Sequence, residues 1–152
     1  MVRLSGSTSK RRHYNRHLPH IEVASLQHKH QRYDTAGDYE AHSVYCWEVR
    51  ISKMSDWRYE AVVLIHELVE MFLLKHHNIS FDVVDKWDLT HPESDDPGEL
   101  PGCPYRKEHL AAEKVEKLFA LLMGVAWDEY WDAFEKLKWH KKRVRRTRGE
   151  QG

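Results

Sequence analysis

The residue types most able to do chemistry lie in the segment His66-Glu67-Leu68-Val69-Glu70. On a helix, His66 and Glu70 are one turn apart and share a face. An imidazole and a carboxylate at this spacing can both reach one divalent transition metal ion. Glu67 lies close to the same face, at the position where a glutamate beside a zinc site acts as general base toward water. We therefore expect His66 and Glu70 to be metal ligands and Glu67 to be the catalytic base.

A second His–Glu pair supplies the ligands that the first pair lacks. A catalytic zinc ion normally has three protein ligands and one open position, and a later helical segment carries His109, Glu113 and Glu116. Burying this much charge without a metal ion or other partners is costly, so two such helices predict one shared site. The expected ligands are His66, Glu70 and His109. Glu113 or Glu116 is then a further ligand, or a hydrogen-bond partner that orients one.

The mixture of imidazole and carboxylate donors favours zinc, with manganese or iron as alternatives. Carboxylates alone suit magnesium, and the chain offers two acidic pairs, Glu67 with Glu70 and Glu113 with Glu116. The alternative without a metal ion is that these glutamates form a solvated edge of two helices. Other candidates are assigned to the surface or the core: His76, His77, Asp82, Asp85 and Asp88 to the surface, and Trp127 and Trp131 to the core.

Strand patterns come before the first long helix and must help to position it. Residues 21–26 alternate in polarity, and residues 44–51 form a β-branched and aromatic run. The segment Asp34-Thr35-Ala36-Gly37-Asp38 has the composition of a turn. These patterns predict a small antiparallel sheet.

Helical patterns occupy the rest of the chain. Ser55 or Asp56 can cap the first helix, Ser80 can cap the second, and Gly124 can end the third. An acidic loop broken by Pro and Gly covers residues 91–104, as a functional lid or a plain connection. The expected helices cover residues 56–77, 80–87, 104–124 and 127–140. The predicted fold class is α+β, with the sheet followed by a bundle of three to four helices.

Charge divides the 152-residue chain into three parts. Residues 1–32 carry seven Lys/Arg and one acidic residue, and residues 134–152 carry eight Lys/Arg and two acidic residues. Residues 33–133, in contrast, carry nine Lys/Arg and 21 acidic residues. We expect a flexible basic segment at 1–18, a single metal-binding domain at 19–140 and a basic tail at 141–152. The acidic middle suits cations better than phosphates. The basic ends could bind nucleic acid or remain solvated.

The sequence has no apolar run of the roughly 18 residues that span a membrane, and its polar, basic start does not look like a secretory signal. Its two cysteines, Cys46 and Cys103, form no CxxC pair and suggest no disulfide framework. We therefore expect a soluble protein of the cytoplasm.

Several of these segments resemble a group of small bacteriophage proteins over roughly residues 30–130. They are Arg32–Asp38, Ser55–Glu60, His66–Glu70 and Pro104–Tyr105 with His109. The resemblance implies a phage-encoded protein that works in the host cell cytoplasm, but it implies no activity.

Strands followed by a helix with His-Glu also resemble the zincin metallopeptidase core. This resemblance implies that His66 is a ligand, that Glu67 is the base, and that residues 44–51 are an edge strand for a peptide substrate. Zincins usually have HExxH, whereas this chain has HExxE because position 70 is Glu.

A weaker similarity, carried by the two acidic pairs, is to the all-α nucleotide pyrophosphohydrolases, which hold magnesium against a triphosphate. Three hypotheses result. The first is a metal-dependent hydrolase in which metal-activated water attacks the carbonyl of a peptide or small-molecule substrate. The second is magnesium-dependent nucleotide hydrolysis. The third is a phage-encoded protein without enzymatic activity that binds a host protein or nucleic acid.

Overall fold

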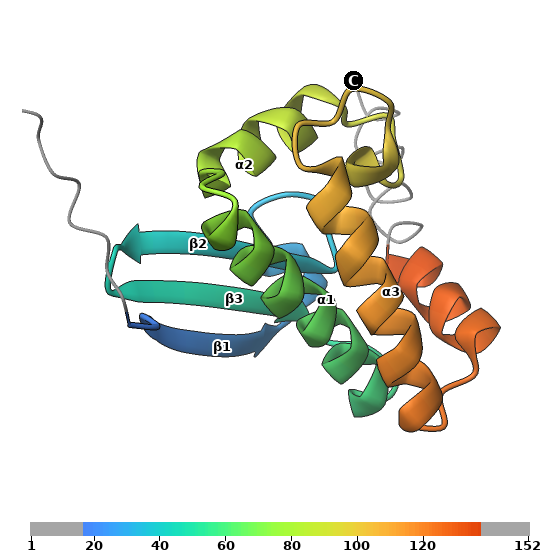
Figure 1. Cartoon of the computed structure of the whole chain (residues 1–152). Helices are drawn as coiled ribbons and strands as arrows, with labels where there is room; N and C mark the ends of the chain where they lie inside the picture. The colour runs from blue at the N-terminus through green and yellow to red at the C-terminus, as the bar shows by residue number, and fades with distance from the viewer. Residues whose placement is uncertain (1–16, 138–152) are drawn as a thin grey trace, which may run out of the picture.

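The computed structural model describes residues 17–137 and has an α+β fold in which a small sheet lies against helices (Figure 1). The predicted α+β class and the predicted number of helices are confirmed. The elements, in chain order, are β1 (His20–Leu26), a 3₁₀ turn η1 (His28–His30), β2 (Gly37–Ser43), β3 (Cys46–Ser52), α1 (Trp57–His76), α2 (Phe81–Thr90), a 3₁₀ turn η2 (Pro97–Glu99), α3 (Arg106–Leu122) and a last helix at 127–137.

The sheet is mixed, so the prediction of an antiparallel sheet is wrong in part. The strand order is β1-β3-β2, with β1 parallel and β2 antiparallel to β3. The physical reason is the connection 27–36, which leaves room beside β1. The β2–β3 hairpin then returns β3 between β1 and β2, so β3 runs parallel to β1. Buried Gln31 fixes this connection, since its side-chain amide donates hydrogen bonds to the carbonyls of Ala36 (3.4 Å) and Arg50 (3.1 Å).

The strand predicted at 44–51 is shifted and is not at an edge. Val44 and Tyr45 form the exposed hairpin turn, and β3 is the central strand, paired on both sides. The edge-strand role expected from the zincin resemblance is therefore wrong for this segment. Strand β2 was not predicted from the sequence, because Gly37 and Asp38 are uncommon in strands. Asp38 is nevertheless buried, since it forms ion pairs with Arg32 (2.8 Å) and Arg50 (3.2 Å).

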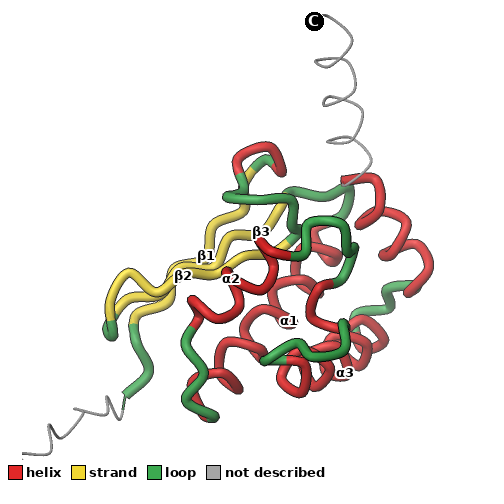
Figure 2. The backbone as a smooth tube through the Cα atoms, turned by 90° about the horizontal axis from the view of Figure 1, so that it is seen from above, coloured by secondary structure: helices red, strands yellow, loops and turns green. Residues whose placement is uncertain are grey.

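Helix α1 lies between the sheet on one side and α3 on the other (Figures 1 and 2). The core face of β3 consists of alternate residues, Trp47, Val49 and Ile51, all buried. Phe81, at the start of α2, packs edge-on against Trp47 at a ring separation of 5.0 Å. Because α1 is covered from two sides, it carries apolar residues around most of its circumference.

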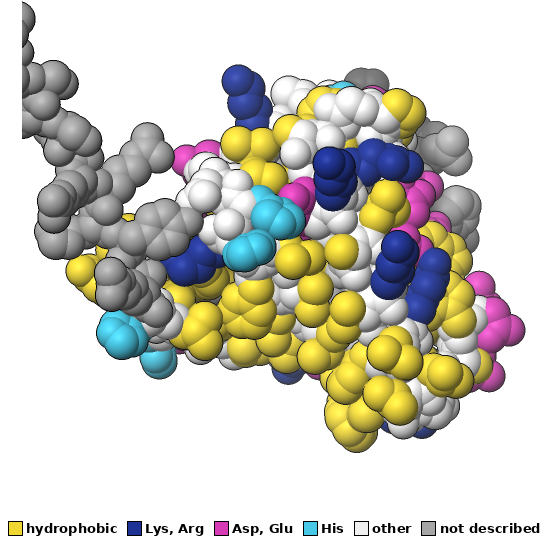
Figure 3. Space-filling model, in the orientation of Figure 1, with side chains coloured by type: hydrophobic (Ala, Val, Ile, Leu, Met, Phe, Trp, Pro, Cys, Tyr) yellow, Lys and Arg dark blue, Asp and Glu magenta, His cyan; other side chains and the backbone are white. Residues whose placement is uncertain are grey.

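Helix α3 has an unusual distribution of polarity. Its buried residues include Glu108 and Glu116, whereas Leu118, Leu121 and Leu122 are more than half exposed. Figure 3 shows apolar side chains spread over the face formed by α1 and α3, interrupted by Lys and Arg. Amphipathic helices normally bury their leucines and expose their glutamates. The buried glutamates therefore need partners inside the molecule.

The helix ends agree with local signals in the sequence. The carboxylate of Asp56 caps α1 by accepting a hydrogen bond from the backbone N–H of Arg58 (2.9 Å), and Ser80 caps α2 in the same way. Asn78 ends α1 with a φ of 58°, and Gly124 follows α3 with a φ of 64°. Helix α2 continues to Thr90, three residues beyond the predicted end. Within residues 17–137, no helix is both long and apolar enough to span a membrane.

We predict that Asp56→Ala lowers the free energy of unfolding by about 1 kcal/mol, because α1 loses its N-terminal cap. Chemical denaturation followed by circular dichroism measures this change. Asp56→Asn, which keeps the capping oxygen, and Ser55→Ala, which removes the neighbouring hydroxyl, should each change stability by less than about 0.5 kcal/mol. An equal loss in Ser55→Ala and Asp56→Ala would contradict the assignment of the cap.

Candidate metal centre

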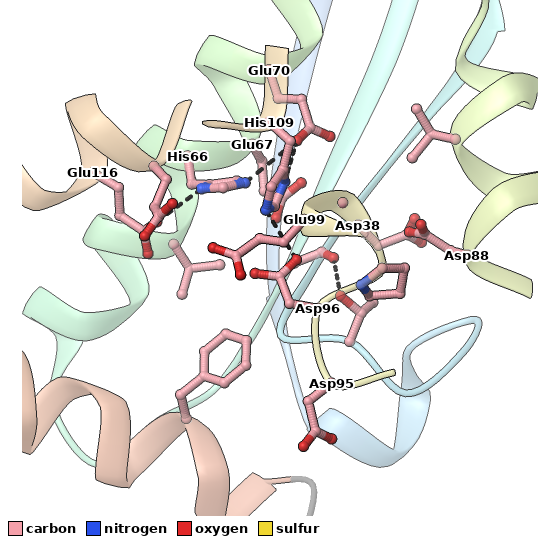
Figure 4. Close-up of a pocket in the computed structure, with 18 of the residues that line it drawn as sticks. Asp38, His66, Glu67, Glu70, Asp88, Asp95, Asp96, Glu99, His109 and Glu116 are labelled. Carbon is pink, nitrogen blue, oxygen red and sulfur yellow. Dashed lines mark hydrogen bonds and ion pairs between the residues drawn. The ribbon is translucent and has the colours of Figure 1, made fainter. Parts of the chain in front are cut away.

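Three side chains from α1 and α3 meet where the two helices are in contact (Figure 4). One ligand atom of each of His66, Glu70 and His109 lies within 4.8 Å of the others. Glu70 Oε2 is the point of convergence, since it lies 2.8 Å from His109 Nδ1 and 3.4 Å from His66 Nε2. The structure thus brings together the three residues that the sequence predicts as ligands.

The other ring nitrogen of each histidine faces a second carboxylate. His66 Nδ1 hydrogen-bonds to Glu116 Oε2 at 2.8 Å, and His109 Nε2 lies 3.0 Å from Asp96 Oδ1. Histidines that ligate metal ions commonly have a carboxylate on the nitrogen that faces away from the ion, which fixes the ring and raises its basicity. Glu116 and Asp96 have this position relative to the three converging atoms.

Two buried tyrosines fix the carboxylates in turn. The hydroxyl of Tyr39, on β2, donates a hydrogen bond of 2.5 Å to Glu70 Oε1. The hydroxyl of Tyr130, on the last helix, donates one of 2.5 Å to Glu116 Oε1. Both oxygens of Glu70 and both oxygens of Glu116 therefore have partners. This is what a buried carboxylate requires.

Electrostatics keep this cluster ionised. Burial alone lowers the pKa of His109, but the carboxylates of Asp96 and Glu70 raise it to about 10. Burial also lowers the pKa of His66, and Glu116 and Glu70 more than reverse the effect. Burial alone raises the pKa of Glu70, but hydrogen bonds from His109 and His66 lower it to about 2. At neutral pH, Glu70 is thus an anion between two imidazolium groups when no metal ion is bound.

Glu67 lies beside the cluster with no ion-pair partner among the described residues. Its carboxylate packs directly on the α-carbon of Gly37, where an added Cβ would come within 2.3 Å of Glu67 Oε1. Burial, together with the charges of Glu70 and Asp38, raises the pKa of Glu67 to about 8, although His66 opposes this rise. A carboxylate with such a pKa can accept and release a proton near neutral pH.

A second glycine gives the loop before α3 close access to the cluster. An added Cβ at Gly98 would come within 2.5 Å of the ring of His109. The η2 turn can therefore cover this ring and place Asp96 beside it. The acidic loop at 91–104, predicted as a lid or a plain connection, contributes one carboxylate directly to the centre (Figure 4).

The remaining predicted ligands have other partners. Glu113 pairs with Lys117 and lines the nearby cavity, but it does not join the three converging atoms. Glu116 orients His66 rather than joining the three atoms. Asp82 is exposed, as expected, whereas Asp88 is half-buried against Tyr105, and burial raises its pKa to about 6.

A cavity of about 520 Å³ opens beside the centre. Residues from β2, α1, α2, η2, α3 and the last helix line it, together with the segment before β2. They include His66, Glu67, Glu70 and His109, as well as Asp88 and Trp131, which the sequence reading assigned to the surface and the core. The three converging residues therefore lie on the wall of this cavity.

A second group of possible ligands, Glu40, His42 and Glu48, lies on the outer face of the sheet. Arg50 already forms ion pairs with Glu40 (2.8 Å) and Glu48 (2.6 Å). A metal ion there would compete with a built-in cation, so this group is better explained as a surface ion-pair network.

Comparisons with protein-family models, with curated proteins and with solved structures found no match to this chain.

We predict that Gly37→Ala displaces the Glu67 carboxylate and lowers the free energy of unfolding by about 1–3 kcal/mol, because the new Cβ overlaps it. Urea denaturation measures the loss. In a Glu67→Ala background the same substitution should cost much less, since the overlapping group is gone. Equal costs in the two backgrounds would show that the contact is not the cause.

Stability of the metal-free protein should fall as the pH rises. The pKa of Glu67 is about 8 in the folded chain and that of His109 is about 10, and both lie above the ordinary values. Between the ordinary and the raised pKa of each group, the folded state therefore binds more protons than the unfolded state. The free energy of unfolding must then decrease with pH, from about 4.5 to 8 for Glu67 and from about 6.5 to 10 for His109.

The measurement is the thermal midpoint of chelator-treated protein between about pH 5 and pH 8, compared with Glu67→Gln. We expect the midpoint to fall by several degrees in the original protein and by less in the variant, which cannot titrate at this position. Parallel curves would show that Glu67 has an ordinary pKa.

Proposed function

We propose that this protein is a metal-dependent hydrolase whose metal ligands are His66, Glu70 and His109 and whose general base is Glu67. One observation carries the proposal: each histidine points one ring nitrogen at Glu70 and the other at a separate carboxylate. Two histidines and one glutamate form a ligand set that catalytic zinc uses, with a further position open to water or substrate. The adjoining cavity gives a substrate access to that position.

The ligand chemistry favours zinc, manganese or iron over magnesium, because two of the three donors are imidazole nitrogens. When bound, the metal ion supplies Lewis acidity, which acidifies water and polarises a carbonyl group. The Glu70 ligand lowers the net charge of the centre and moderates this acidity. The hydroxyl of Tyr39 holds Glu70 in place and offsets part of its negative charge.

Glu67 supplies the proton transfer. Its carboxylate lies on the wall of the cavity and has no cationic partner among residues 17–137, so it is available to water or substrate. It can take a proton from the attacking water and return it to the leaving group. The contact with Gly37 restricts the carboxylate to this position.

The nucleotide alternative has less support. The four glutamates of the two acidic pairs do line one cavity, but Glu70 and Glu116 are held by histidines and tyrosines, and Glu113 is paired with Lys117. Among the described residues, no Lys or Arg lines this cavity to meet a triphosphate. The interaction alternative relied on the basic ends, and the tail at 141–152 and nearly all of 1–18 lie outside the described residues.

The test begins with elemental analysis of the purified, untagged protein. We expect about one equivalent of zinc, manganese or iron, since the ligand set can hold a single ion. His66→Ala and His109→Ala should each lose it. His76→Ala, which removes an exposed histidine from the same helix, is the matched control and should keep it.

Glu67→Gln separates chemistry from binding. It should retain the metal ion and lose at least about 100-fold in the rate of cleavage of a mixed library of fluorescence-quenched peptides, because the base is gone. A protein that contains no metal ion and takes up none on titration would refute the proposal. Retained cleavage in Glu67→Gln would refute the role of the base.

A further inference from the structure

We propose that the cavity beside the metal centre selects a substrate with at least two positively charged groups, either ammonium or guanidinium, as in a basic peptide segment. The inference rests on the proposed hydrolase site and names its substrate class. It is carried by the charge, the partners and the aromatic residues of the cavity wall.

The wall of the cavity is strongly acidic. Eleven of its residues are carboxylates, two are histidines, and none of its described residues is Lys or Arg. The carboxylates come from β2, α1, α2, the 91–104 loop, α3 and the last helix, so they surround the space instead of lying on one face. They are Asp38, Glu67, Glu70, Asp85, Asp88, Asp95, Asp96, Glu99, Glu113, Glu116 and Asp128. A cavity lined by one sign of charge concentrates ligands of the opposite sign.

Within residues 17–137, cationic side chains pair with only some of these carboxylates. Arg32 pairs with Asp38 and Asp85, and Lys117 pairs with Glu113. The positive charge of the two histidines or of a bound metal ion would balance the negative charges of Glu70, Glu116 and Asp96. Apart from the base Glu67, three carboxylates have no ion pair with a cationic side chain in residues 17–137: Asp88 on α2, Glu99 on η2 and Asp128 on the last helix. The remaining carboxylate, Asp95, has an interaction of its own.

Aromatic rings add a second, independent feature that suits organic cations. Trp131 lines the cavity, is 41% exposed and stacks parallel to Phe134 at a ring separation of 5.3 Å. Trp127 lines the same wall, and the ammonium group of Lys117 already lies 5.4 Å from its ring centre. Ammonium and guanidinium groups bind aromatic faces in this geometry, whereas inorganic ions prefer water or oxygen ligands.

The size of the cavity indicates how many positive charges its ligand carries. A volume of about 520 Å³ lies within the range of drug-sized ligands and exceeds what a single ammonium group needs. Asp88, Glu99 and Asp128, which have no ion pair within residues 17–137, come from three different elements around this space. An extended chain with separated charges suits this arrangement. A peptide also supplies the carbonyl group that the proposed hydrolysis requires.

Calorimetric binding to the full-length protein tests the inference, with and without one equivalent of zinc. The probes are Ac-Gly-Lys-Gly-Lys-Gly-NH₂, the same peptide with both lysines acetylated, the same peptide with Glu in place of Lys, and spermidine. We expect the lysine peptide to bind about tenfold or more tightly than either altered peptide, and its binding to weaken with salt. Tighter binding of spermidine than of the peptide would support the charge class and identify a free polyamine as its source.

Two double variants locate the effect. Glu99→Gln/Asp128→Asn removes from the cavity wall two charges that have no ion pair within residues 17–137, and it should weaken binding of the lysine peptide about three- to tenfold. Glu93→Gln/Glu129→Gln removes two exposed charges from the same two segments but not from the cavity wall, and should leave binding within about twofold. All four side chains are exposed, so neither variant should impair folding.

Equal binding of the three peptides, no binding of the lysine peptide, or equal weakening in the two double variants would each overturn the inference. These results are independent of metal content and turnover, since the zinc-free arm measures the cavity alone. A protein without metal or hydrolase activity that still selects the lysine peptide would refute the proposed function and leave the charge selectivity in place.

Discussion

The burial of one carboxylate, that of Glu70, is the constraint on which the rest of the structure depends. The residue is only 4% exposed, and a buried charge is tolerated only when it is paired and hydrogen-bonded. Its partners come from three places: Tyr39 on β2, His66 on α1 itself and His109 on α3. Satisfying Glu70 therefore requires the sheet, α1 and α3 to meet at one point. This meeting point forms both the core junction and the candidate centre.

The same requirement explains why α3 buries glutamates and exposes leucines. Glu116 is buried against His66 and Tyr130, while Leu118, Leu121 and Leu122 remain exposed. A helix arranged only for stability would bury its leucines, because replacing buried ion pairs by apolar contacts is often neutral or stabilising. The chain instead places charge inside and apolar surface outside. Such a local conflict with folding rules is typical of functional sites.

The parts that the sequence predicted are those with local signals. The cap at Asp56, the stop near Asn78 and the i, i+4 pairing of His66 with Glu70 are each encoded within a few residues, and the structure has helices where these signals occur. The strand β2 was missed because its charged Asp38 is stabilised by arginines elsewhere in the chain. Asp96, Tyr39 and Tyr130 were missed because nothing near them in the sequence indicates their distant partners. The parallel pairing of β1 likewise depends on a ten-residue connection that leaves room for β3 beside β1.

The ionisation of the centre determines what a metal ion would have to displace. Without an ion, the raised pKa values of His66 and His109 place two positive charges around the anionic Glu70. A divalent ion that binds these three residues must displace both protons, and it brings two positive charges in their place. The net charge of the cluster is then the same in both states, so Glu116 and Asp96 face the same total charge in each. Binding at such a site would exchange two protons for one ion, so the affinity for metal would fall as the pH is lowered.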